Sequence, residues 1–224
     1  FRPQELADTA WSFARLDVQN LPLMSSFAGQ LLKGGYLEGF TAQGITMSVM
    51  AFARLGVWNE VLMDAVAKRV IADGFLATFN AHELGVLIGA FSSLGTKSSS
   101  SVQKELMQRI IRRLLDPTFL QTFTAQELTA IMRATAILSI YNERLMEAVA
   151  QRLMDKAFMS TFDPWDVRHL LQAFARLGVR HADMMTSIRL HVQKDTFLEA
   201  CNADDLAVIT WAFETICGQY GQHC

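Results

Sequence analysis

The tetrapeptide Phe13-Ala14-Arg15-Leu16 returns unchanged as Phe52-Ala53-Arg54-Leu55 and again as Phe174-Ala175-Arg176-Leu177. Aligning the chain on these copies gives units that begin 39, 39, 44, 39 and 39 residues apart. The one longer step contains Ser98–Ser101, which we interpret as a loop insertion. The units are residues 1–39, 40–78, 79–122, 123–161, 162–200 and the half unit 201–224. A fixed period of this length is typical of a repeat protein, in which each unit is one supersecondary structure.

A helix start is expected at the same place in five units. A capping residue stands there before Ala or Pro, namely Thr41, Asn80, Thr124, Asp163 and Asn202. Its side chain can accept a hydrogen bond from the free amides of the first helical turn. An acidic residue three positions later favours a capping box, at Glu83, Glu127, Asp166 and Asp205. Gly56, Gly95 and Gly178 are placed to end this first helix in the left-handed conformation.

The second half of each unit has a helical pattern of its own. Apolar residues recur four positions apart, as at Leu62, Val66 and Val70. A closing segment follows and carries an aromatic residue at Tyr36, Phe75, Phe119, Phe158 and Phe197. Two short helices cannot bury their apolar faces alone, so neighbouring hairpins must stack. We therefore predict an all-α fold, an α-solenoid coiled as a right-handed superhelix, with about 5.5 helical hairpins of 39 residues in a single array over residues 1–224.

Composition excludes several classes of protein. The chain of 224 residues is 51% hydrophobic and 19% charged, which is too apolar for a disordered chain. It lacks an apolar run of about 18 residues, so we expect no membrane insertion. The formal net charge of −2 excludes a polybasic tail but not a local basic patch. The cysteines Cys201, Cys217 and Cys224 have neither metal-site nor disulfide-framework spacing.

The sequence shows no catalytic constellation. His82-Glu83 is not followed by the second histidine that a zinc-protease helix requires. No glycine-rich phosphate loop follows a strand, because no strand is expected. We predict that the protein is not an enzyme and has no cofactor, no metal and no small-molecule substrate.

The first-helix motif resembles a known type of repeat. Residues 4–16, from Gln4 to Leu16, and residues 166–179, from Asp166 to Val179, are similar to the leucine-alanine and tryptophan-alanine-phenylalanine-alanine-arginine-leucine element of octotricopeptide and heptatricopeptide repeats. The resemblance covers the whole chain, although no RAP domain is visible. It implies a non-enzymatic organellar protein, in mitochondria or alternatively in plastids, that binds single-stranded or ribosomal RNA during transcript or ribosomal RNA maturation.

Each first helix has a second face whose residues vary from unit to unit. Such variation on a regular scaffold is what a binding surface would show, because aromatic and arginine side chains stack on unpaired bases and Gln or His can bind base edges. The alternative is packing between repeats, above all for the two tryptophans at the ends. The candidate residues are Trp11, Arg15, Met50, Arg54, Arg133, Trp165, His169, Gln172, Arg176 and Trp211.

A basic column recurs on the second helices. Two readings of this column stay open. Side chains spaced by one repeat could follow the phosphates of an RNA strand, or they could form ion pairs with the acidic cap residues of neighbouring units. Its members are Lys68, Arg69, Arg112, Arg113, Arg152 and Arg189, with His191 in the next unit.

Two functions follow from these patterns. The first is an RNA-binding subunit of an organellar ribonucleoprotein, such as a mitochondrial ribosome, in contact with other protein subunits. The second is a protein scaffold or accessory subunit that uses the same surface without touching RNA. The near-neutral charge favours the second function, whereas the resemblance favours the first.

Overall fold

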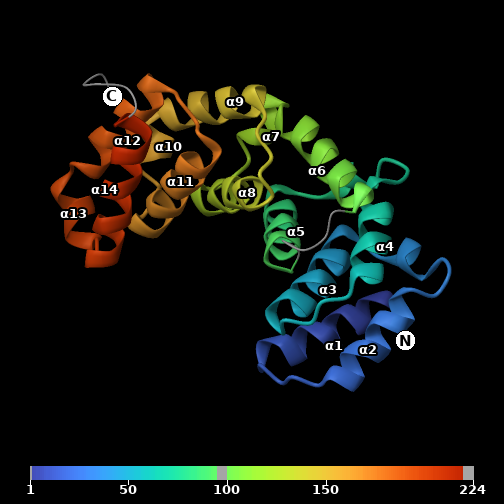
Figure 1. Cartoon of the computed structure of the whole chain (residues 1–224). Helices are drawn as coiled ribbons and strands as arrows, with labels where there is room; N and C mark the ends of the chain where they lie inside the picture. The colour runs from blue at the N-terminus through green and yellow to red at the C-terminus, as the bar shows by residue number, and fades with distance from the viewer. Residues whose placement is uncertain (1, 95–99, 219–224) are drawn as a thin grey trace. The chain divides into compact units, whose positions relative to one another are not determined.

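The chain is entirely α-helical in the part that the structure describes. This computed structural model describes residues 2–94 and 100–218, which contain helices and no strand (Figure 1). Gly95, most of the serine-rich insertion and Cys224 therefore lie outside the described residues. The chain divides into two compact units, Phe1–Arg113 and Leu114–Cys224, where the sequence period alone predicts a single array. Among the described residues, none of the helices has the length and apolar character that a membrane span requires.

Unit 1 contains three helical hairpins. The first helices α1 (Pro3–Arg15), α3 (Ala42–Arg54) and α5 (Ala81–Leu94) pack in succession, α1 on α3 and α3 on α5. Three longer second helices and two short 3-10 helices complete the unit: α2 (Leu21–Leu31), α4 (Glu60–Ile71), α6 (Ser101–Leu114), η1 (Tyr36–Gly39) and η2 (Phe75–Thr78).

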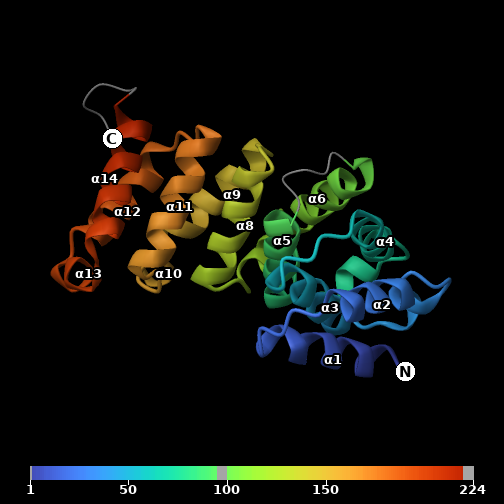
Figure 2. The same ribbon diagram turned by 60° about the horizontal axis from the view of Figure 1, so that its bottom comes forward.

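Unit 2 has the same construction. Its first helices α8 (Ala125–Ile137), α11 (Pro164–Leu177) and α14 (Ala203–Cys217) lie side by side (Figure 2). The second helices α9 (Glu143–Met154) and α12 (Ala182–Val192) pack on each other behind them. Three short helices link the hairpins: α7 (Pro117–Leu120), α10 (Lys156–Met159) and α13 (Asp195–Ala200).

The predicted first-helix caps are confirmed. The side chains of Thr41, Asn80, Thr124, Asp163 and Asn202 each accept a hydrogen bond from the amide three residues on. Complete capping boxes form at Asn80, Thr124 and Asn202. The second helices have caps that the sequence analysis missed, at Asn20, Asn59, Asn142 and His181.

Four first helices end in one way. Gly56 and Gly178 are left-handed with φ of 65°, as predicted. Asp17 and Ser139 occupy the same position with φ of 53° and 54°, although neither residue favours it. In each case the next amide bonds back to the carbonyl five residues earlier, as from Val57 to Phe52. This is the Schellman motif, and it turns the chain toward the second helix.

The closing segments are short helices, which the sequence analysis did not anticipate. Their aromatic residues pack edge-to-face on the Phe that precedes the next cap, with ring centroids 5.2–5.8 Å apart. The pairs are Tyr36–Phe40, Phe75–Phe79, Phe119–Phe123 and Phe158–Phe162. This arrangement of rings fixes the backbone between one hairpin and the next.

Candidate nucleic-acid interface

The variable face of the first helices is most completely built in unit 2. Trp165 lies in the first turn of α11 and is 43% exposed. His169, one turn later, stacks against it with ring centroids 4.1 Å apart. The guanidinium carbon of Arg133, on the neighbouring helix α8, lies 5.4 Å from the centre of the Trp165 ring. We call this group the Arg133–Trp165–His169 stack.

Hydrogen bonding fixes the histidine of this stack. His169 Nδ1 lies 2.7 Å from the carbonyl oxygen of Trp165. Because a carbonyl only accepts, Nδ1 must donate, which leaves Nε2 as an acceptor when the ring is neutral. Burial lowers the pKa of His169, the Trp165 carbonyl opposes this change, and Arg133 and Arg168 lower the pKa further. His169 therefore presents a hydrogen-bond acceptor at neutral pH.

The charges around the stack are only partly balanced. Arg168 of α11 pairs with Asp205 of α14, its Nη1 3.2 Å from the carboxylate Oδ1. Burial lowers the pKa of Arg133, and the charge of Arg168 lowers it further. A cation that is partly desolvated next to another cation is stabilised by an approaching anion. The sequence analysis did not select Arg168, although it lies about one repeat before Asp205 in the sequence.

The other residues of this face are exposed to different extents. Arg15 and Arg54 are exposed near the ends of α1 and α3 in unit 1, whereas Trp11 and Met50 are half-buried. In unit 2, Arg176 is exposed, Gln172 is half-buried, and Trp211 is 48% exposed on α14. Packing between repeats therefore does not cover Trp211 within the described residues.

The basic column is mostly engaged with the protein's own backbone. Arg69 Nε donates to the carbonyl of Leu37 at 3.2 Å, and its guanidinium lies over the Phe75 ring at 3.6 Å. We call Arg69, Arg113 and Arg152 the second-helix arginines. They share this role: each donates to carbonyls that lie 31 to 37 residues earlier.

Arg113 makes the most of these contacts. Its guanidinium donates to the carbonyls of Leu76, Ala77 and Phe79, the last two at 3.2 and 2.6 Å. Arg152 donates to the carbonyl of Gln121 at 3.3 Å and lies 3.8 Å over the Phe158 ring. These side chains hold the closing segment of the preceding hairpin, a role that neither sequence interpretation included.

The remaining basic residues of the column differ from the second-helix arginines. Lys68 and Arg112 are exposed. Arg189 lies 5.7 Å over the Phe213 ring, with one nitrogen 4.0 Å from Cys217 Sγ. His191 takes the place of an arginine and donates from Nε2 to the carbonyl of Phe162 at 3.0 Å.

Metal binding has no support in residues 2–94 and 100–218, where no group of three or more His, Cys, Asp or Glu side chains is arranged to hold an ion. The carboxylate of Asp166 is the most perturbed acid described. Burial, and then the nearby Asp163, raise the pKa of Asp166 to about 6. Its Oδ1 is buried without a hydrogen-bond partner.

A comparison with known protein families identifies the chain. The profile of the RNA-editing substrate-binding complex 6 protein family matches residues 34–217, well over half of the sequence. No curated protein sequence matches. This family differs from the octotricopeptide and heptatricopeptide families, so the resemblance to those two is not confirmed. The match spans both units of the structure, and the chain therefore belongs to the RNA-editing substrate-binding complex 6 protein family.

Proposed function

We propose that this protein is a non-enzymatic RNA-binding subunit of an organellar, and specifically mitochondrial, RNA-editing complex. The observation that carries the proposal is the Arg133–Trp165–His169 stack, because it combines a half-exposed aromatic face with cations on a family member whose name refers to substrate binding in RNA editing. Such a surface suits unpaired RNA, whose bases are free to stack on aromatic rings.

Each member of the stack has a role in the proposed contact. Trp165 provides the stacking platform for one base. The acceptor at His169 Nε2 binds an amino or imino group at the base edge. Arg133 and the exposed Arg176 attract the phosphates on either side. The recurrence of the first-helix face in successive hairpins favours about one nucleotide per repeat, and we propose that the 39-residue period describes such hairpins within each unit.

A protein scaffold remains the second candidate function. Two observations favour it: the net charge is −2, and the second-helix arginines bind backbone carbonyls. A surface that contacts other subunits would also use exposed tryptophans such as Trp165 and Trp211, because aromatic residues are enriched in protein interfaces.

The two functions are separated by titrating a fluorescent single-stranded RNA with the protein at several salt concentrations. We expect binding that weakens steeply with salt. Trp165→Ala should weaken it about tenfold, since one stacked base contributes about 1–3 kcal/mol. Tyr141→Ala is the matched control, because Tyr141 is an exposed aromatic residue in the turn before α9, away from the stack. An absence of binding at low salt would leave the scaffold as the function.

A further inference from the structure

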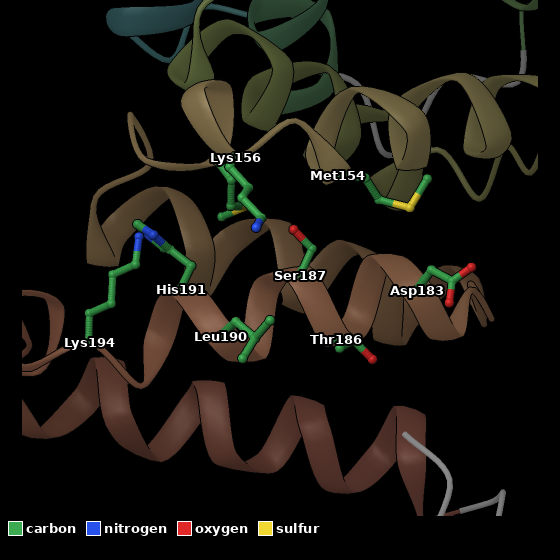
Figure 3. A pocket seen from close by; sticks show the side chains of 9 residues that line it. Met154, Lys156, Asp183, Thr186, Ser187, Leu190, His191 and Lys194 are labelled. Atoms are coloured by element: carbon green, nitrogen blue, oxygen red, sulfur yellow. The ribbon is translucent and has the colours of Figure 1, made fainter.

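Unit 2 contains a pocket that the proposed RNA face does not use. It has a volume of about 430 Å³ and lies between α12 and the α9–α10 segment (Figure 3). That volume is within the range of small-molecule sites in proteins. None of its lining residues belongs to the Arg133–Trp165–His169 stack.

One end of the pocket is basic. Lys156 from α10 and Lys194 from the end of α12 both line it, together with His191. Figure 3 shows the Lys156 side chain pointing over α12 toward Ser187, and Lys194 reaching toward the His191 ring. Two ammonium groups and an imidazole thus gather around one small volume.

His191 is poised but incompletely bonded. It is only 7% exposed, and its Nε2 donates to the Phe162 carbonyl. Its Nδ1 is buried without a hydrogen-bond partner. Burial, and to a smaller extent the charge of Lys194, lower the pKa of His191. An anion bound beside Lys194 would favour a proton on Nδ1, and the ring would then donate to that anion.

The opposite end of the pocket has a different character. Met154 and the 60% exposed Leu190 supply apolar walls. Asp183 and Thr186 lie at this end, and Asp183 is eight residues, or roughly 12 Å of helix, before His191. The Asp183 carboxylate accepts hydrogen bonds and repels a second anion. A matching ligand has one anionic end, a flat apolar body and neutral donors at its far end.

We propose that this pocket binds a nucleoside 5′-phosphate, with the phosphate between Lys156, Lys194 and His191 and the base against Met154 and Leu190. Flexible thioether and leucine side chains adapt to the face of a base. Ammonium groups bind phosphate as point charges. The ribose hydroxyls or the exocyclic amine then donate to Asp183. A segment with several carboxylates fits less well, because Asp183 would face one of them.

Isothermal titration with adenosine monophosphate tests the site. We expect saturable binding at low salt, competition by inorganic phosphate, and much weaker binding of adenosine or of phosphate alone. Lys156→Gln and Lys194→Gln should each weaken binding about tenfold, as expected for loss of one charge-assisted contact. Both lysines are exposed, so these variants should fold normally. Lys104→Gln, an exposed lysine of α6 outside the pocket, is the control and should leave affinity unchanged.

The source of the nucleotide is decided with a short RNA in the Trp165→Ala background, which removes stacking on the proposed RNA face. Displacement of adenosine monophosphate by a 5′-phosphorylated RNA but not by its 5′-hydroxyl form identifies an RNA end as the ligand; displacement by neither identifies a free nucleotide. The proposal is overturned if adenosine monophosphate does not bind at millimolar concentration, if both lysine variants bind it as the wild type does, if phosphate alone binds as tightly, or if a glutamate-rich peptide displaces it.

Discussion

The arginines of the first and second helices have the same charge and recur at the same period, yet they serve different purposes. Arg15, Arg54 and Arg176 are exposed at the ends of α1, α3 and α11. The second-helix arginines, by contrast, donate to carbonyls of the preceding hairpin. A basic column in a repeat protein is therefore not by itself a nucleic-acid surface. The partners of each guanidinium, and not its position in the period, indicate whether it is available to a ligand.

The largest effect is expected from Arg113→Ala. The substitution leaves the carbonyls of Leu76, Ala77 and Phe79 without their guanidinium donor, and it should lower the free energy of unfolding by about 2–4 kcal/mol. Arg112→Ala removes the exposed neighbour on the same helix and should cost less than about 0.5 kcal/mol. Urea unfolding of the two variants measures the difference, and equal losses would contradict a structural role for Arg113.

Asp166→Asn should stabilise the protein at neutral pH. The pKa of the folded carboxyl is about 6, above its ordinary value of 3.8, so the folded state binds more protons between these values. This stability is present below pH 3.8 and is lost as the pH rises through 6. The variant avoids the loss and should unfold with about 1–2 kcal/mol more free energy at pH 7.5.

Thermal unfolding at pH 4.5 and 7.5 checks this prediction, since the advantage of Asp166→Asn should shrink at the lower pH. Asp204→Asn, at an exposed position in the first turn of α14, is the control and should change stability little at either pH. An equal gain from Asp166→Asn at both pH values would mean that titration of Asp166 is not its origin.

A smaller effect is expected for the ion pair beside the stack. Arg168 and Asp205 are 23% and 8% exposed, so a double-mutant cycle with Arg168→Gln and Asp205→Asn should give a coupling of about 1 kcal/mol. The more exposed pair Arg109–Glu105, at 47% and 48%, should give only about 0.3–0.5 kcal/mol. The reverse order would show that Arg168 is not held by Asp205 in solution.

The smallest effect on folding is expected from Arg15→Gln and Arg54→Gln. Both side chains are exposed, so each change should alter the free energy of unfolding by less than about 0.5 kcal/mol. If these arginines contact phosphates, the double variant should lower the slope of log affinity against log salt by about 1.4 for single-stranded RNA. A loss of folding stability without a change of slope would reverse the assignment of the two sets of arginines.

Local signals made much of the fold predictable. The caps at Thr41, Thr124 and Asn202 act over only three residues, so the sequence contains both partners of each hydrogen bond. Gly56 and Gly178 were predictable in the same way, because glycine favours a positive φ. Asp17 and Ser139 adopt that conformation without such a signal, because the Schellman hydrogen bonds impose it.

The candidate site was only partly predictable. The helical period placed Trp165 and His169 on one face, four residues apart, and the structure confirms their contact. Their approach to Arg133, 32 residues earlier in the sequence, depends on how α8 packs on α11. The pocket at Lys156 and His191 gave no sequence signal, since its walls come from three separate helices.

The sequence by itself determined the helical hairpins, their caps and their repeat, because these depend on propensities and hydrogen bonds within a few residues. Only the tertiary structure decided what the charged columns do. A guanidinium can bind a backbone carbonyl, a carboxylate or a phosphate equally well in chemical terms. For Arg69 and Arg113 the nearest acceptors are carbonyls that lie more than 30 residues earlier and reach them only when two hairpins pack together.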